Sequence, residues 1–136
     1  MRTPFHLWAL GLLLVLWNCW GLFGAIAAQG GFLPQMPDEA SAYFEQQPLW
    51  FVALADFSPL AGVAGAMAVL LQSRWAPRLF LAQIAIALLA TAYELITGTS
   101  PLFGGGPAWG STGLLLGLLF AQYLYARFLL KRGLLD

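Results

Sequence analysis

Four long apolar segments constrain the fold of this chain more than any other feature. They cover residues 7–28, 50–71, 79–97 and 112–130. Each has about 19–22 residues, enough for a helix to cross about 30 Å of hydrocarbon. Because lipid offers no hydrogen bonds to the backbone, such segments are expected to be helices. We therefore predict a single domain, residues 1–136, that folds as an all-α membrane protein, an antiparallel bundle of four transmembrane helices.

Composition agrees with lipid as the solvent of this chain. Charged residues make up 9% of the 136 residues and hydrophobic residues 60%, whereas a soluble domain carries about 25% charged residues. The net charge of zero leaves no basic face for nucleic acid. Cys19 is the only cysteine, so an intrachain disulfide is excluded.

The basic residues predict the orientation of the bundle. All six lie before the first segment, between the second and third, or at the end of the fourth: Arg2, Arg74, Arg78, Arg127, Lys131 and Arg132. Basic residues favour the cytoplasmic side of a membrane. Both termini and the turn around Arg74 are therefore predicted to be cytoplasmic, and loops 29–49 and 98–111 to face outward.

The first segment has an alternative interpretation as a cleaved signal peptide. Arg2 and the small residues of 25–28 fit that pattern. However, the segment is longer than a typical signal and contains Trp17 and Asn18, which favours a retained helix. Cleavage would leave three spans and an N-terminus outside.

Four polar residues inside the segments form a candidate intramembrane site: Glu94, Asp56, Asn18 and Gln83. Ionisable residues within a membrane are functional candidates. Asp56 and Glu94 are expected at similar depth, toward the outer face. The alternative is that both carboxylates reach interfacial water, and that Asn18, near mid-bilayer, stabilises a helix interface.

Small residues predict where helices approach closely. Gly62 and Gly65 belong to a patch of small side chains on the second segment, and Gly113 and Gly117 form a Gly-x-x-x-Gly motif on the fourth. This motif is also a candidate for dimerisation. Gln122 is expected to face away from it.

The chain offers no recognisable catalytic or metal-binding set. His6 is the only histidine, and no Ser-His-Asp set, Cys-His pair or pair of histidines on one helix is present. We therefore expect no enzyme activity, no metal and no cofactor.

Three groups of residues carry a resemblance to a known family. They are Leu16-Trp17-Asn18-x-x-Gly21; Met36-Pro37 with Tyr43, Pro48 and Trp50; and Gly62-x-x-Gly65 with Leu70-Leu71 and Arg74-Trp75-Ala76-x-x-Leu79-Phe80. Together, over about residues 5–97, they resemble small uncharacterised bacterial inner-membrane proteins of four helices, often labelled "sugar transporter". The resemblance implies a bacterial inner-membrane location and hints at transport.

Two functions are open at this point. The first is a structural or accessory membrane protein that packs against itself or against a larger membrane complex. The second is a carrier of a small solute, a sugar or a proton-coupled substrate, with Glu94, Asp56 and Asn18 lining an outward cavity. Four spans are few for a transport pathway, so a carrier is expected to act as an oligomer.

Overall fold

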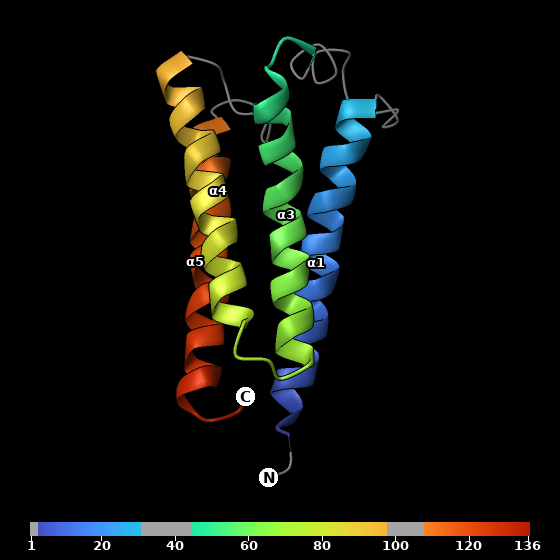
Figure 1. Cartoon of the computed structure of the whole chain (residues 1–136), viewed down its shortest axis with the longest axis vertical. Helices are drawn as coiled ribbons and strands as arrows, with labels where there is room; N and C mark the ends of the chain where they lie inside the picture. Colours follow the sequence, from blue (N-terminus) through green and yellow to red (C-terminus); the bar gives the residue numbers. More distant parts are fainter. Residues whose placement is uncertain (1–2, 31–44, 98–107) are drawn as a thin grey trace.

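The computed structural model describes residues 3–30, 45–97 and 108–136. Within these ranges the chain forms four helices and no strand: α1 (Phe5–Gly30), α3 (Leu49–Leu70), α4 (Ala76–Thr97) and α5 (Ala108–Lys131). They run side by side in alternating directions, with both ends of the chain at one end of the bundle, here called the terminal end (Figure 1). The predicted antiparallel four-helix fold is confirmed.

Each helix is long and apolar enough to cross a membrane. The apolar stretches have 20 to 23 residues and a mean hydropathy of 1.6 to 2.0. Three helices extend past the predicted apolar segments, α4 by beginning at Ala76, while α3 is shifted by one residue to Leu49–Leu70. Pro77 is compatible with that start, because the first turn of a helix has no hydrogen bond that proline would remove. Which end of the bundle faces the cytoplasm stays a prediction.

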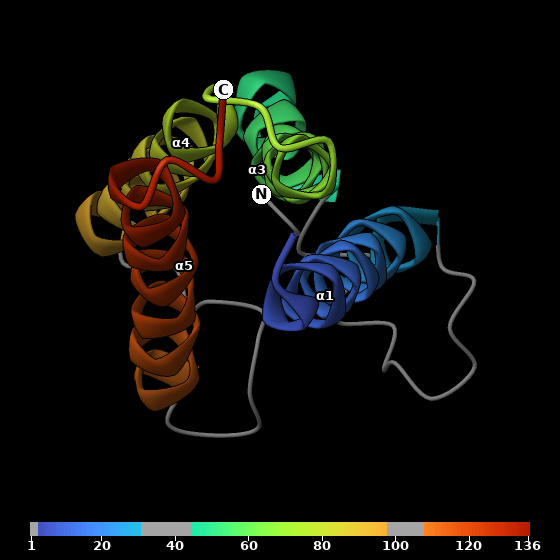
Figure 2. The same ribbon diagram turned by 90° about the horizontal axis from the view of Figure 1, so that it is seen from below.

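The helices are arranged as an open arc and not as a closed square. Among the described helices, extensive contacts join α1 to α3, α3 to α4 and α4 to α5. Figure 2 shows α1 and α5 at the two ends of this arc, diverging with distance from the terminal end. α1 and α5 are therefore edge helices, each packed closely on one neighbour.

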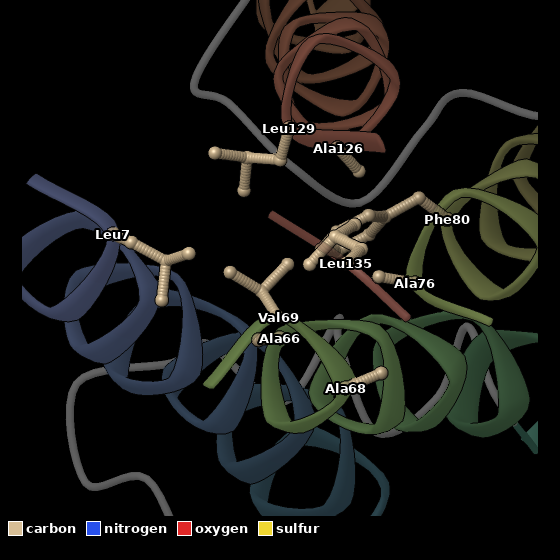
Figure 3. Packing of buried hydrophobic residues seen from close by; sticks show 9 residues of the cluster. All are labelled: Leu7, Ala66, Ala68, Val69, Ala76, Phe80, Ala126, Leu129 and Leu135. Carbon is tan, nitrogen blue, oxygen red and sulfur yellow. The ribbon is translucent and has the colours of Figure 1, made fainter. Parts of the chain in front are cut away.

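The apolar core lies at the terminal end, where the four helices converge. Leu7 of α1, Val69 of α3, Phe80 of α4 and Leu129 of α5 are fully buried there. In Figure 3 their side chains point toward a common centre. This core closes one end of the arc while the helices separate toward the other end.

The C-terminal segment completes this end. Leu135 is 4% exposed and belongs to the core. The Asp136 N–H donates to the Gln72 carbonyl at 2.7 Å, and the Arg74 N–H donates to the Asp136 carbonyl at 2.8 Å. Gln72 has a φ of 57°, a left-handed conformation that turns the chain between α3 and α4. The segment after α5 is thus joined to the α3–α4 turn.

Large apolar side chains are exposed along all four helices, among them Trp20, Phe57, Ile96 and Leu114. A water-soluble monomer rarely exposes contiguous apolar surface on this scale. The exposed faces are suited to contact with lipid.

Candidate functional site

Three amide side chains from three helices meet inside the bundle. Gln83 of α4 donates from Nε2 to Asn18 Oδ1 at 2.9 Å. Asn18 of α1 donates from Nδ2 to Gln122 Oε1 of α5 at 2.7 Å, and also to the Leu14 carbonyl at 2.8 Å. The three side chains are 2–4% exposed. We call Asn18, Gln83 and Gln122 the amide cluster; it links α1 and α5 across the arc.

The remaining helix, α3, makes room for the amide cluster with a glycine. A Cβ atom on Gly62 would collide with Asn18 Oδ1 and Gln83 Nε2. One turn further, a Cβ on Gly65 would come within 2.9 Å of the Phe80 ring. Both predicted packing glycines of α3 therefore lie at close approaches, where any side chain would force a neighbour to move.

The amide cluster is not fully paired within the described part of the chain. Gln83 Oε1 and Gln122 Nε2 are buried there without a hydrogen-bond partner. One of these atoms is an acceptor and the other a donor. A buried polar atom without a partner costs about 1–3 kcal/mol. The net stabilisation from the cluster is therefore smaller than its hydrogen bonds alone would suggest.

The two carboxylates lie apart from the amide cluster. Asp56 is half-buried and accepts a hydrogen bond at Oδ1 from Gln29 Nε2, at 2.7 Å. Glu94 is also half-buried and lies eleven residues after Gln83 on α4, or about 16 Å along the helix. Of the four predicted site residues, the structure brings together Asn18 and Gln83 and leaves Asp56 and Glu94 toward the opposite end.

Gly113 and Gly117 lie on an exposed face of α5. A Cβ atom added to either glycine would have no described atom within 4 Å other than its chain neighbours and the nearby backbone of α5. They therefore provide no close packing within this chain. Contact between chains through these glycines stays a prediction.

Gln122 is the member of the cluster that is not among the predicted site residues. It was correctly expected to face away from Gly113 and Gly117, but that face of α5 turned out to be the inner one. The available signal was its spacing, since Leu119, Ala126 and Leu129, at intervals of three and four residues on the same face, are also buried.

The amide cluster can bind and orient but cannot titrate. Asparagine and glutamine side chains donate and accept hydrogen bonds and stay neutral. Among the described residues, no group of three or more His, Cys, Asp or Glu side chains is placed to hold a metal ion. The chemistry available at this site is hydrogen bonding between helices.

Four helices able to span a membrane, three of them joined by buried amides, define a multi-pass integral membrane protein. Comparisons with protein-family models, with curated proteins and with solved structures gave no match. The class therefore rests on the fold and composition of the chain itself, and the resemblance noted above stays a hypothesis.

Proposed function

We propose that the protein is a non-enzymatic structural or accessory subunit that packs against itself or against a larger membrane complex. The proposal rests on how the buried polar side chains of the protein are bonded. Asn18, Gln83 and Gln122 bond to one another and are almost completely buried. In this arrangement the amides join helices, which is a structural task.

The position of the carboxylates also supports this proposal. A carrier would need its ionisable groups and its binding amides around one solvent-reachable cavity. Asp56 instead pairs with Gln29, and Glu94 is about 16 Å along α4 from the amide cluster. A site assembled from all four predicted residues does not form in this conformation.

The open arc supplies surfaces for association. α5 packs extensively only on α4 among the described helices, and its Gly113 and Gly117 are exposed. Glycines four residues apart let a second helix approach closely in lipid, where packing and not hydrophobicity drives association. This face of α5 is our candidate contact surface.

A second candidate function is a small-solute carrier acting as an oligomer. It is favoured by the unpaired buried Gln83 Oε1 and Gln122 Nε2, which a hydroxyl group could satisfy as donor and acceptor at once.

Crosslinking in native membranes tests the accessory proposal. With Cys19 replaced by serine, Gly117→Cys is compared with Leu88→Cys. Leu88 is exposed on α4, and each position lies nine residues from the end of its helix away from the terminal end, so depth in the membrane is matched. We expect oxidation to link Gly117→Cys to a second copy or to a stoichiometric partner, and Leu88→Cys to stay unlinked.

Purification in mild detergent completes the test. The proposal predicts a homo-oligomer or a stoichiometric complex. A monomer that purifies alone, shows no crosslink at either position and moves a solute after reconstitution would overturn it in favour of the carrier.

A further inference from the structure

A hollow at the terminal end lies between the two edge helices. It has a volume of about 400 Å³ and is lined by His6, Phe128, Arg132 and Leu134. His6 is in the first turn of α1, and Phe128 is in the last turn of α5. Their neighbours Leu7 and Leu129 are fully buried in the core. The hollow therefore lies on the outside of the core, where α1 and α5 come together.

The polar side of the hollow is suited to an anion. The Arg132 guanidinium lies 5.1 Å from the centre of the Phe128 ring. This contact with the ring face holds the cation and leaves N–H groups free to form paired hydrogen bonds with a phosphate. Arginine is the side chain best matched to that geometry.

His6 provides a second donor. Its Nδ1 lies 3.0 Å from the Tyr125 hydroxyl. The hydroxyl has a second acceptor, the His6 carbonyl oxygen at 3.4 Å, but Nδ1 is the closer one. When the hydroxyl donates to Nδ1, the ring proton sits on Nε2, which can donate to an anion. The contact with Tyr125 thus orients the histidine ring at the rim.

The charge balance at this end is positive. All described basic residues lie here: Arg74, Arg78, Arg127, Lys131 and Arg132. The carbonyl end of α5 contributes about half a negative charge, and Asp136, exposed and joined through its backbone to the α3–α4 turn, adds an acid. The three cations Arg127, Lys131 and Arg132 on or just after α5 outweigh both.

The apolar side of the hollow continues into lipid. Phe128 and Leu134 line it, and α1 and α5 diverge from it along the bundle (Figure 2). Exposed apolar side chains follow on both helices, Trp8 and Leu12 on α1 and Leu124 on α5, and in a membrane such side chains contact acyl chains. A phosphate at one end and acyl chains along the helices together describe a phospholipid.

We propose that this hollow binds the headgroup phosphate of an anionic phospholipid whose acyl chains lie against the exposed apolar side chains of α1 and α5. Arg132 holds the phosphate, His6 donates to it, and Phe128 positions the guanidinium. Basic pockets between transmembrane helices are known to bind anionic headgroups. This proposal does not depend on the proposed function above.

Native mass spectrometry of the detergent-solubilised full chain tests the proposal. The protein is titrated with phosphatidylglycerol, with phosphatidylcholine and with inorganic phosphate. Arg132→Gln is compared with Arg78→Gln, a matched control because the Arg78 guanidinium lies 4.7 Å from the Trp75 ring centre at the same end of the bundle.

We expect phosphatidylglycerol to bind in preference to phosphatidylcholine, and Arg132→Gln to weaken that binding about fivefold, since one basic residue contributes about 1 kcal/mol to binding an anionic lipid. Arg78→Gln should bind as the unmodified protein does, and Arg132→Lys should restore only part of the affinity.

Three outcomes would overturn the proposal. Equal binding of phosphatidylglycerol by Arg132→Gln and by the unmodified protein would show that Arg132 does not hold the phosphate. Equal losses in Arg132→Gln and Arg78→Gln would show general attraction to a positive surface. Binding of inorganic phosphate as tight as that of phosphatidylglycerol would identify a free anion as the ligand.

Discussion

Asn18 is the residue on which the polar interior depends, because it alone bonds to both other amides of the cluster. Asn18 is predicted from the sequence to line an intramembrane site or to stabilise a helix interface, and Gln83 to belong to the same site. Their pairing could not be predicted, since periodicity within a helix identifies a face but not the residue opposite it. Gln122 illustrates the same limit, because one face of α5 meets the interior and the other meets lipid.

Replacing Asn18 alone should therefore lower the free energy of unfolding more than replacing all three amides of the cluster. Asn18→Leu removes three hydrogen bonds, two to side chains and one to the Leu14 carbonyl. It leaves Gln83 Nε2 and Gln122 Oε1 buried without partners, for a loss of about 1–3 kcal/mol. Unfolding in mixed micelles, followed by tryptophan fluorescence, measures this. In the combined variant Asn18→Leu, Gln83→Leu and Gln122→Leu no polar atom is stranded, so its loss should be smaller. A larger loss in the combined variant would contradict the structural role of the cluster.

Gly62 of α3 and Gly24 of α1 should respond differently to alanine. Gly62→Ala places a methyl group against Asn18 and Gln83 and should destabilise the protein by about 1–3 kcal/mol. Gly24→Ala meets no described atom within 4 Å and should be neutral, or stabilising by up to about 1 kcal/mol through helix propensity. The same unfolding assay compares them, and equal effects would argue against the close approach at Gly62.

At the scale of the elements, length and apolarity were enough to predict four helices, but not how they pack. An apolar side chain is compatible with either lipid or protein, so the hydropathy of α1 or α5 does not indicate how many neighbours it has. The structure shows both to be edge helices. The segment after α5 was not predicted to pack at all, yet Leu135 is part of the core.

This segment should contribute measurably to stability. Leu135→Ala removes a buried side chain from beyond the end of α5 and should cost about 2–4 kcal/mol. Leu114→Ala is the control, because Leu114 is 69% exposed and its loss should change stability by less than about 0.5 kcal/mol. If the two variants unfold at the same detergent concentration, the contact of this segment with the core is not maintained in solution.

At the scale of the whole molecule, the antiparallel order of the helices places both ends of the chain together. It does not say on which side of the membrane they lie. The distribution of basic residues predicts the cytoplasm, and in the structure all described basic residues do gather at the terminal end. The orientation is thus a prediction about the membrane and not about the fold.

Cysteine labelling in intact cells checks that orientation. In the Cys19→Ser protein, Thr97→Cys and Asp136→Cys place one thiol at each end of the bundle, at exposed positions that alter no basic residue. An impermeant maleimide should label Thr97→Cys directly, and Asp136→Cys only after the membrane is permeabilised. The reverse pattern would place the termini outside.

The sequence by itself determined that this protein has four helices long and apolar enough to span a membrane, and which of their residues are unusual in that setting. It could do so because lipid forces every crossing segment to satisfy its own backbone, which makes length and hydropathy decisive. Only the tertiary structure decided that Asn18, Gln83 and Gln122 meet while Asp56 and Glu94 do not, and that His6 and Arg132 line one hollow. Those contacts depend on the rotation and tilt of each helix against its neighbours, which packing sets and composition does not record.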